Sequence, residues 1–204
     1  STALLLDMYE KKQFAPASFD LPAAERIRNS NKEDARATAI WDAVKNRYEA
    51  ERKAFKSKLT KYMAIAEKKG GEAKAGKVLF QTCLLCHKVG NEGKNIAPAL
   101  DGSASRENEA LLTAILDPDA AVESNYAVYR ITKKNGSTIE GYLVNKNNRG
   151  TTIAFMGGSQ VFVEAGAIQS QGFLGGRSFM VKGLIDQYSD KQVADLLAYI
   201  RTIK

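Results

Sequence analysis

Five consecutive residues carry the most reactive side chains of the chain: Cys83, Leu84, Leu85, Cys86 and His87. They include both cysteines and the one histidine of its 204 residues. Two thiols three positions apart can reach the two vinyl groups along one edge of a porphyrin and form thioethers. The imidazole that follows the second thiol can point at the iron. C-x-x-C-H is the attachment signature of c-type haem, so the sequence predicts one covalently bound haem c with His87 as an iron ligand.

Other uses of a cysteine pair fit the sequence less well. A structural zinc site usually takes four cysteine or histidine ligands, and the chain has no second pair. A thioredoxin-like redox pair is expected between a strand and a helix, whereas a helical run over 72–81 leads into these cysteines. A disulfide between Cys83 and Cys86 stays open for an oxidising compartment, but it gives His87 no role.

The composition is that of an ordinary globular protein, with 44% hydrophobic and 26% charged residues. The formal net charge is +7, but the lysines are spread along the chain and no nucleic-acid-binding motif accompanies them. We therefore expect solvated surface lysines and no nucleic-acid partner. No stretch approaches the roughly 18 consecutive apolar residues of a transmembrane helix, so no membrane span is expected.

The expected location follows from the haem chemistry. The first residues do not form a signal peptide, because the apolar run 3–6 is short and Asp7 follows it. Haem is attached to C-x-x-C-H on the far side of the bacterial inner membrane. We therefore expect a periplasmic or secreted protein, and we expect this chain to be a piece of a longer secreted protein or a processed form.

Residues 1–70 are predicted to form an N-terminal helical segment, either a linker or the end of helical repeats. Pro22 suits the first turn of a helix that Asp20 caps. The stretch 32–69 is rich in Ala, Lys, Glu and Arg and contains no proline or glycine. Because one helix of that length would be far longer than average, a break is expected near 42–47.

Four aromatic residues of this segment recur every seven positions: Trp41, Tyr48, Phe55 and Tyr62. Such a stripe can seed a coiled coil, which would make the chain a dimer through its N-terminal helices. More often, one helix face of this kind packs inside its own domain.

Residues 71–204 are predicted to form the haem domain, which begins and ends with a helix. Gly76, either Leu79 or Phe80, and Cys83 fall on one face of the first helix, and Gly76 would let another helix approach closely. The last helix is the natural partner, because Ser189 and Gln192 form a capping box ahead of its apolar face. Phe80 is a candidate haem contact on the shared face, and Pro98 is a candidate to position the His87 ring through its backbone.

Between these helices the pattern changes from helical to strand-like. A helix follows the glycine-rich loop and ends at Asp117 and Pro118. Four short segments rich in Tyr, Val, Ile and Thr come next, namely 126–133, 137–145, 151–155 and 160–164. An Asn-Gly pair at 135–136 favours a tight hairpin between the first two. The predicted fold is mainly α with an antiparallel β-meander inserted at about 125–165.

These features resemble a known family. The segments 76–80, 83–90 and 97–100 are similar to class I cytochrome c. The segments 111–118, 125–126, 178–180 and 183–184, with the strands around Gly141, resemble the C-terminal haem-binding domain of large secreted planctomycete and verrucomicrobial proteins. The resemblance covers about 72–204 and implies a cytochrome c fold with a β insertion, a bis-ligated haem and electron transfer.

The sixth iron ligand is left open by the residues alone. A second histidine is excluded, and the sulfur candidates are Met8, Met63, Met156 and Met180, with lysine or an open position as alternatives. Met180 lies shortly before the last helix, where class I cytochromes place their ligand, and the resemblance implies Met180. The family usually has proline after this methionine, whereas this chain has Val181, so the ligand loop lacks that stiffening.

The predicted function is that of an electron-transfer module, not an enzyme. Its partner would be a redox protein or a dehydrogenase domain of the same parent chain. No constellation for a general base or nucleophile is found, and Ser/His/Asp catalysis is excluded because the one histidine is committed to iron. The alternative is a haem enzyme or a gas or redox sensor with an open or labile sixth position, in which Arg177 would lie near the ligand loop.

Overall fold

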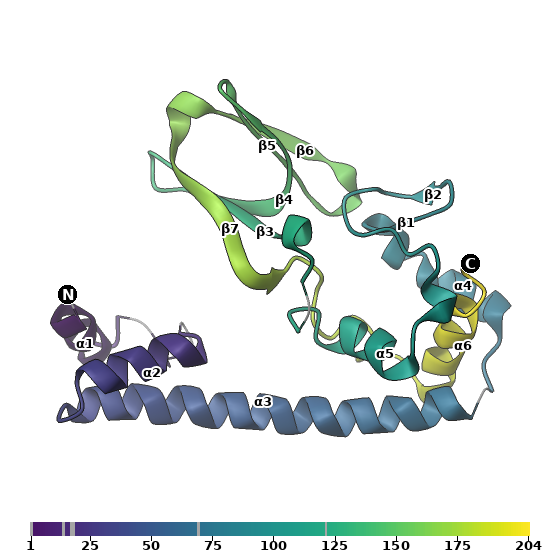
Figure 1. Ribbon diagram of the computed structural model, residues 1–204, viewed down its shortest axis with the longest axis horizontal. Helices are drawn as coiled ribbons and strands as arrows, with labels where there is room; N and C mark the ends of the chain where they lie inside the picture. Colours follow the sequence, from purple (N-terminus) through teal and green to yellow (C-terminus); the bar gives the residue numbers. More distant parts are fainter. Residues whose placement is uncertain (1, 14, 17–18, 69, 121) are drawn as a thin grey trace. The chain divides into compact units, whose positions relative to one another are not determined.

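The computed structural model describes residues 2–13, 15–16, 19–68, 70–120 and 122–204 (Figure 1). It divides into two compact units, Ser1–Lys58 and Leu59–Lys204. The division falls inside a long helix, α3 (Ala35–Glu67). The domain boundary predicted near residue 70 lies further along, between α3 and α4 (Ala73–Phe80), and stays a prediction.

The first unit contains α1 (Thr2–Glu10), α2 (Leu21–Ser30) and the first part of α3. The predicted start of α2 is confirmed: Asp20 caps it by accepting a hydrogen bond from the Ala23 backbone N–H at 2.7 Å. Buried apolar side chains from all three helices make the core, with Trp41 packed against it: Leu6, Ala24, Ile27, Ala37, Ile40 and Val44.

The expected break in the long helix is wrong, because α3 runs without interruption. Ion pairs between residues four apart bridge the place where the break was expected, Lys45 with Glu49 at 3.8 Å and Arg47 with Glu51 at 3.5 Å. Such pairs each add a few tenths of a kcal/mol to a helix. With no proline or glycine in 35–67, nothing in the sequence forces the helix to end early.

The aromatic stripe along α3 has different surroundings at its two ends. Trp41 packs on the core of the first unit. Tyr62 is buried within the second unit, where its hydroxyl lies 3.5 Å from the Ile185 carbonyl oxygen. Tyr48, between them, is 40% exposed. The stripe is therefore partly internal packing, and dimerisation through it stays a prediction.

The second unit is framed by α4 and α6 (Asp190–Ile200), which pack side by side (Figure 1). A Cβ atom on Gly76 would lie 1.9 Å from the Asp195 carbonyl oxygen, so only glycine permits this approach. The expected contact between the first and last helices is thereby confirmed. The capping box is confirmed as well, with Ser189 and Gln192 each bonding the other's backbone N–H.

Short elements connect the frame. The 3-10 turn η2 (Cys83–Leu85) follows α4, and β1 (Lys88–Val89) pairs with β2 (Glu92–Gly93). Next come η3 (Ser103–Ser105) and α5 (Asn108–Leu116), whose apolar face is buried through Leu111, Leu112 and Leu116.

The predicted β insertion is present between α5 and α6. Among the described residues, five strands form one antiparallel sheet in the order β6-β5-β4-β3-β7. Their bounds are β3 (Ala127–Lys133), β4 (Thr138–Asn147), β5 (Gly150–Ala154), β6 (Gln160–Glu164) and β7 (Ile168–Ser178). The first four make the predicted meander. The inner face of the sheet has its own core of Tyr129, Ile131, Ile153 and Val163.

The fifth strand, β7, was missed because its sequence does not favour a strand. It contains Gly172, Gly175 and Gly176, and glycine is depleted in strands. In the structure, β7 pairs with β3 along the far edge of the meander and ends at the pair Ala127–Ser178. The insertion therefore extends to 178, beyond the predicted 165, and leads directly into the segment that carries Met180.

Candidate haem-attachment site

The Cys-x-x-Cys-His motif continues the chain of α4 as a tight turn. The Cys83 carbonyl oxygen accepts hydrogen bonds from the Cys86 backbone N–H at 3.2 Å and from the His87 backbone N–H at 2.9 Å. Both cysteines are free thiols, so the alternative of a disulfide staple is not observed. Burial raises the pKa of Cys83 to about 11, which leaves this thiol protonated at neutral pH.

The imidazole of His87 is held from one side. Its Nδ1 lies 2.6 Å from the Pro98 carbonyl oxygen, to which an Nδ1–H would donate. Burial lowers the pKa of His87, so the neutral ring is favoured. A hydrogen bond at one ring nitrogen fixes the ring orientation and leaves the other nitrogen, Nε2, as a metal ligand. This arrangement supports the predicted role of Pro98.

The loop after His87 closes over the backbone of the motif. The Ile96 and Ala97 N–H groups both donate to the Cys86 carbonyl oxygen, at 3.2 and 3.0 Å. The Lys94 N–H lies 3.2 Å from the His87 carbonyl oxygen. A Cβ on Gly93, which has a φ of +86°, would fall 2.2 Å from that same oxygen. Glycine at 93 therefore lets the loop come this close.

The segment carrying Met180 is tied to the end of α5. The Ser178 backbone N–H donates to Asp119 Oδ1 at 2.7 Å, and the Met180 N–H donates to Ser178 Oγ at 3.1 Å. Lys182 Nζ lies 3.0 Å from both Asp117 Oδ1 and Asp119 Oδ2. The two carboxylates therefore hold the chain on both sides of Met180.

This role of Asp117 and Asp119 is not visible in the sequence. The two residues flank Pro118 at the end of a helix, which suggested only that the helix stops there. Their partners lie about 60 positions later in the chain, and Ser178 takes part through its backbone, so no local pattern marks the contact. The only signal in the sequence was a possible charge pairing of Asp117 and Asp119 with Lys182, which follows the candidate ligand Met180 by two residues.

The other methionines lie in different surroundings. Met8 is in α1 of the first unit, and Met63 is on α3. Met156 is at the tip of the β5–β6 hairpin, in η5 (Met156–Gly158), as predicted, and is 48% exposed. Because η5 contacts η2, Met156 lies nearer the cysteine motif than its position in the sequence suggests.

Phe80 is buried in the helical frame. It is 1% exposed and meets the ring of Tyr199 on α6 edge to face, with the ring centroids 5.0 Å apart. This contact stabilises the crossing of α4 and α6. A contact between Phe80 and haem stays a prediction.

The donor set fits covalent haem c and not a structural metal ion. It offers two free thiols and one imidazole, whose Nδ1 is held by the Pro98 carbonyl oxygen. Among the described residues, no group of three or more Cys, His, Asp or Glu side chains could hold a metal ion. When bound, haem c supplies one-electron redox chemistry at its iron. Cys83 and Cys86 would hold it, and His87 would ligate the iron.

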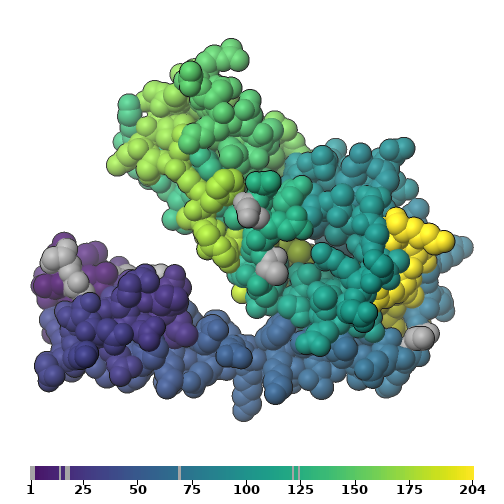
Figure 2. All heavy atoms as spheres, in the orientation of Figure 1, coloured from purple at the N-terminus to yellow at the C-terminus, as the bar shows by residue number. Residues whose placement is uncertain are grey.

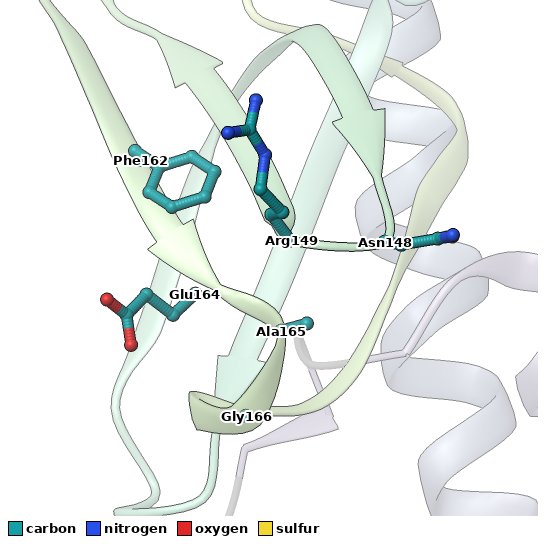
Figure 3. A pocket seen from close by; sticks show the side chains of 6 residues that line it. All are labelled: Asn148, Arg149, Phe162, Glu164, Ala165 and Gly166. Atoms are coloured by element: carbon teal, nitrogen blue, oxygen red, sulfur yellow. The ribbon is translucent and has the colours of Figure 1, made fainter.

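A shallow pocket lies elsewhere on the sheet. It is lined by Asn148, Arg149, Phe162, Glu164, Ala165 and Gly166 (Figure 3). These residues are at the β4–β5 turn and the end of β6, at the opposite end of the β5–β6 strands from the hairpin tip that contacts η2. The pocket is therefore separate from the haem-attachment site.

Comparison with protein families gives a match to cytochrome c over residues 73–204, well over half of the chain. A comparison with curated proteins gives no significant match. No helix within the described ranges has the length and apolar character needed to cross a bilayer. The matched segment begins with α4, contains the cysteine motif and ends with α6, so the chain belongs to the cytochrome c family of haem-binding electron-transfer proteins and carries a covalently attached haem c.

Proposed function

We propose that the chain is a one-electron carrier module whose haem is attached through Cys83 and Cys86 and ligated by His87 and Met180. One observation carries the proposal: Asp117 and Asp119 hold the segment on both sides of Met180. A sixth ligand that is held in place closes the coordination shell. A closed shell suits electron transfer, because the iron then changes oxidation state without exchanging ligands.

The ties to Asp119 also offset the missing proline. Proline at 181 would limit the backbone of the ligand segment, and Val181 does not. Here the Ser178 N–H and the Lys182 ammonium, on either side of Met180, share one carboxylate. Fixing both flanks reduces the conformational freedom that Met180 loses when it binds iron. His/Met ligation would raise the reduction potential relative to stronger donors.

The side chains that the alternative functions would use are already paired with carboxylates. Lys182, the lysine nearest to Met180 in sequence, is paired with Asp117 and Asp119. Arg177, which a haem enzyme could use beside an open site, pairs with Glu140 at 3.1 Å. The first pairing weighs against Lys182 as the sixth ligand, and the second weighs against a haem enzyme that uses Arg177 at an open site.

We further infer that the carrier works outside the inner membrane, where haem c is attached, and that it exchanges electrons with a redox protein or with a dehydrogenase domain of its parent chain. The N-terminal helical segment would link the haem domain to that parent. Size-exclusion chromatography with light scattering, with and without 1–69, tests the predicted dimer. An unchanged stoichiometry would reject the coiled-coil role of the stripe.

A pair of methionine variants tests the ligand assignment. The holoprotein should show low-spin ferric haem with the weak far-red sulfur-to-iron band. Met180→Leu should lose that band and bind carbon monoxide in the ferrous form. Met156→Leu is the matched control, because Met156 also lies near the motif, and it should keep the band. Loss of the band in Met156→Leu and its survival in Met180→Leu would reassign the ligand to the hairpin tip.

A further inference from the structure

The inserted sheet sends one large side chain away from its own core. Neighbouring residues on a strand point to opposite faces, and in β4 Leu143 packs on the inner core of the sheet. Tyr142 therefore belongs to the outer face, where it pairs with Ala154. It is nevertheless only 5% exposed. Something outside the sheet covers it.

One side of Tyr142 is covered by the residue next to the proposed ligand. The ring of Phe179, which immediately precedes Met180, meets the Tyr142 ring edge to face at 5.3 Å between centroids. Tyr126, just before β3, contacts Tyr142 in a similar geometry at 6.3 Å. Edge-to-face pairs of this kind stabilise a contact beyond the area they bury. The sheet therefore restrains the ligand segment through an aromatic contact.

Tyr142 also lies near the haem-attachment motif, because its partner Ala154 ends the strand that leads into η5, and η5 contacts η2. Burial raises the pKa of Tyr142 to about 12, and Cys86 contributes to this rise. In the holoprotein Cys86 would be a neutral thioether, so only the proximity of the two residues carries over.

The hairpin tip reaches the same motif, because η5 contacts the turn η2 that carries Cys83. Gly158 packs near the Lys94 side chain. In Figure 2 the green atoms of the insertion adjoin the teal atoms of the motif and its loop.

The hydroxyl of Tyr142 has no hydrogen-bond partner among the residues that the structure describes. Its ring packs against Tyr126 and Phe179. The hydroxyl oxygen is not one of the enclosed, unpaired polar atoms of the described residues, so it reaches open space and can donate to a group bound there. The inner-face residue Tyr129 is equally buried, yet it packs inside the sheet against Phe173 and away from the motif.

We propose that Tyr142, supplied by the inserted sheet, is a positioning residue of the haem pocket: its ring holds the Met180 segment against the Cys86 edge, and its hydroxyl donates a hydrogen bond to an acceptor in the loaded site. This rests on the proposed attachment at Cys86 and ligation by Met180. The acceptor is either the Met180 sulfur or an oxygen of the haem propionates. Both would take the same hydroxyl proton, and the experiment separates them.

The hydroxyl is tested by Tyr142→Phe, which keeps the ring contacts. A donated hydrogen bond favours the more electron-rich, reduced form. Its net worth of about 0.5–1.5 kcal/mol corresponds to about a twofold to tenfold loss in the ratio of reduced to oxidised protein at a fixed applied potential. Spectroelectrochemistry measures that ratio on holoprotein. Tyr129→Phe, the matched control in the same sheet, should leave it unchanged.

The acceptor is identified by repeating Tyr142→Phe in a Met180→Leu background. If the acceptor is the methionine sulfur, the effect of Tyr142→Phe disappears there. If the acceptor is a propionate, the effect persists. A double-mutant cycle of this kind isolates the interaction between the two sites.

The positioning role is tested by Tyr142→Leu, which removes the ring. The far-red band should weaken, and ferrous protein should bind carbon monoxide that the wild type excludes. If Tyr142→Phe keeps the wild-type ratio of reduced to oxidised protein, the proposed hydrogen bond is wrong. If Tyr142→Leu still excludes carbon monoxide, the proposed positioning role is wrong. Failure of the proposed function is distinguishable, because the wild type itself would then lack the far-red band.

Discussion

The two sides of the proposed haem site are built in opposite ways. On the histidine side, the thiols, the imidazole and the Pro98 carbonyl that holds it all fall within 83–98, joined by backbone hydrogen bonds of a single turn and loop. On the methionine side, Met180 is held through Asp119 and the aromatic contact to Tyr142, both far away in the chain. The histidine side is therefore preorganised locally, and the methionine side depends on the tertiary fold.

The largest effect is expected from removing His87, the ligand on the locally built side. His87→Ala takes away the fixed ligand, and we expect little stable holoprotein or a grossly altered spectrum. Met180→Ala should still accumulate with covalent haem, because both thiols and His87 remain. Haem-stained yield and absorption spectra of the two variants measure the difference. Equal loss of holoprotein in both would contradict the asymmetry.

The helical frame supports both sides, so weakening it should affect the whole domain. Gly76→Ala places a Cβ 1.9 Å from the Asp195 carbonyl oxygen on α6. Overpacking of this kind lowers the free energy of unfolding by about 1–3 kcal/mol. The upper end is expected here, because the clash is with backbone atoms and not with a flexible side chain. Urea unfolding of ferric holoprotein measures the loss.

Gly166→Ala is the matched control for that change. Gly166 has nothing within 4 Å of an added Cβ, and its φ is not in the left-handed region. We expect a change within about 0.5 kcal/mol. Equal destabilisation by both substitutions would mean that the approach of α4 to α6 does not need glycine.

The histidine side was predictable because its information is local. Five residues specify the haem chemistry, and the spacing to Pro98 falls within one loop. The frame was predictable for a similar reason, since the Ser189–Gln192 capping box and Gly76 mark helix ends and helix contacts directly.

The methionine side was predictable only in part. A resemblance pointed to Met180, but nothing in the spacing reveals that Asp119 binds the Ser178 N–H, because a backbone donor leaves no trace in the sequence. The glycines of β7 hid the strand that leads to Met180. The outward placement of Tyr142 depends on the register of β4 against β5, which the local pattern does not fix.

A smaller effect should follow from cutting the ties of the ligand segment. Asp119→Ala removes the acceptor of the Ser178 N–H and one partner of Lys182, so the Met180 segment should open more often. We expect a several-fold increase in carbon monoxide binding to ferrous protein and a weaker far-red band. Asp117→Ala removes only a Lys182 contact and is the matched control. Equal effects would show that the Ser178 hydrogen bond does not matter.

The smallest effect concerns acid stability of the frame. Lys191 and the Glu72 backbone N–H, each 2.6 Å from Asp195 Oδ1, hold the pKa of that buried carboxyl below its ordinary value of 3.8. Its contribution is therefore present above the unfolded pKa and is lost as pH falls through the lower, folded pKa. Asp195→Asn should lower the free energy of unfolding at pH 7 and make it decrease less as the pH is lowered. Urea unfolding at a series of pH values measures both effects. Glu164→Gln, exposed on the sheet, should leave that fall unchanged.

The most direct test of the account is the optical spectrum of wild-type holoprotein in its ferric and ferrous forms, followed by carbon monoxide. The account predicts low-spin ferric haem with a far-red sulfur-to-iron band and no carbon monoxide binding, because Met180 closes the iron on a side that the distant ties hold. High-spin ferric haem, or ready carbon monoxide binding by the wild type, would contradict it and assign the chain to ligand-binding chemistry.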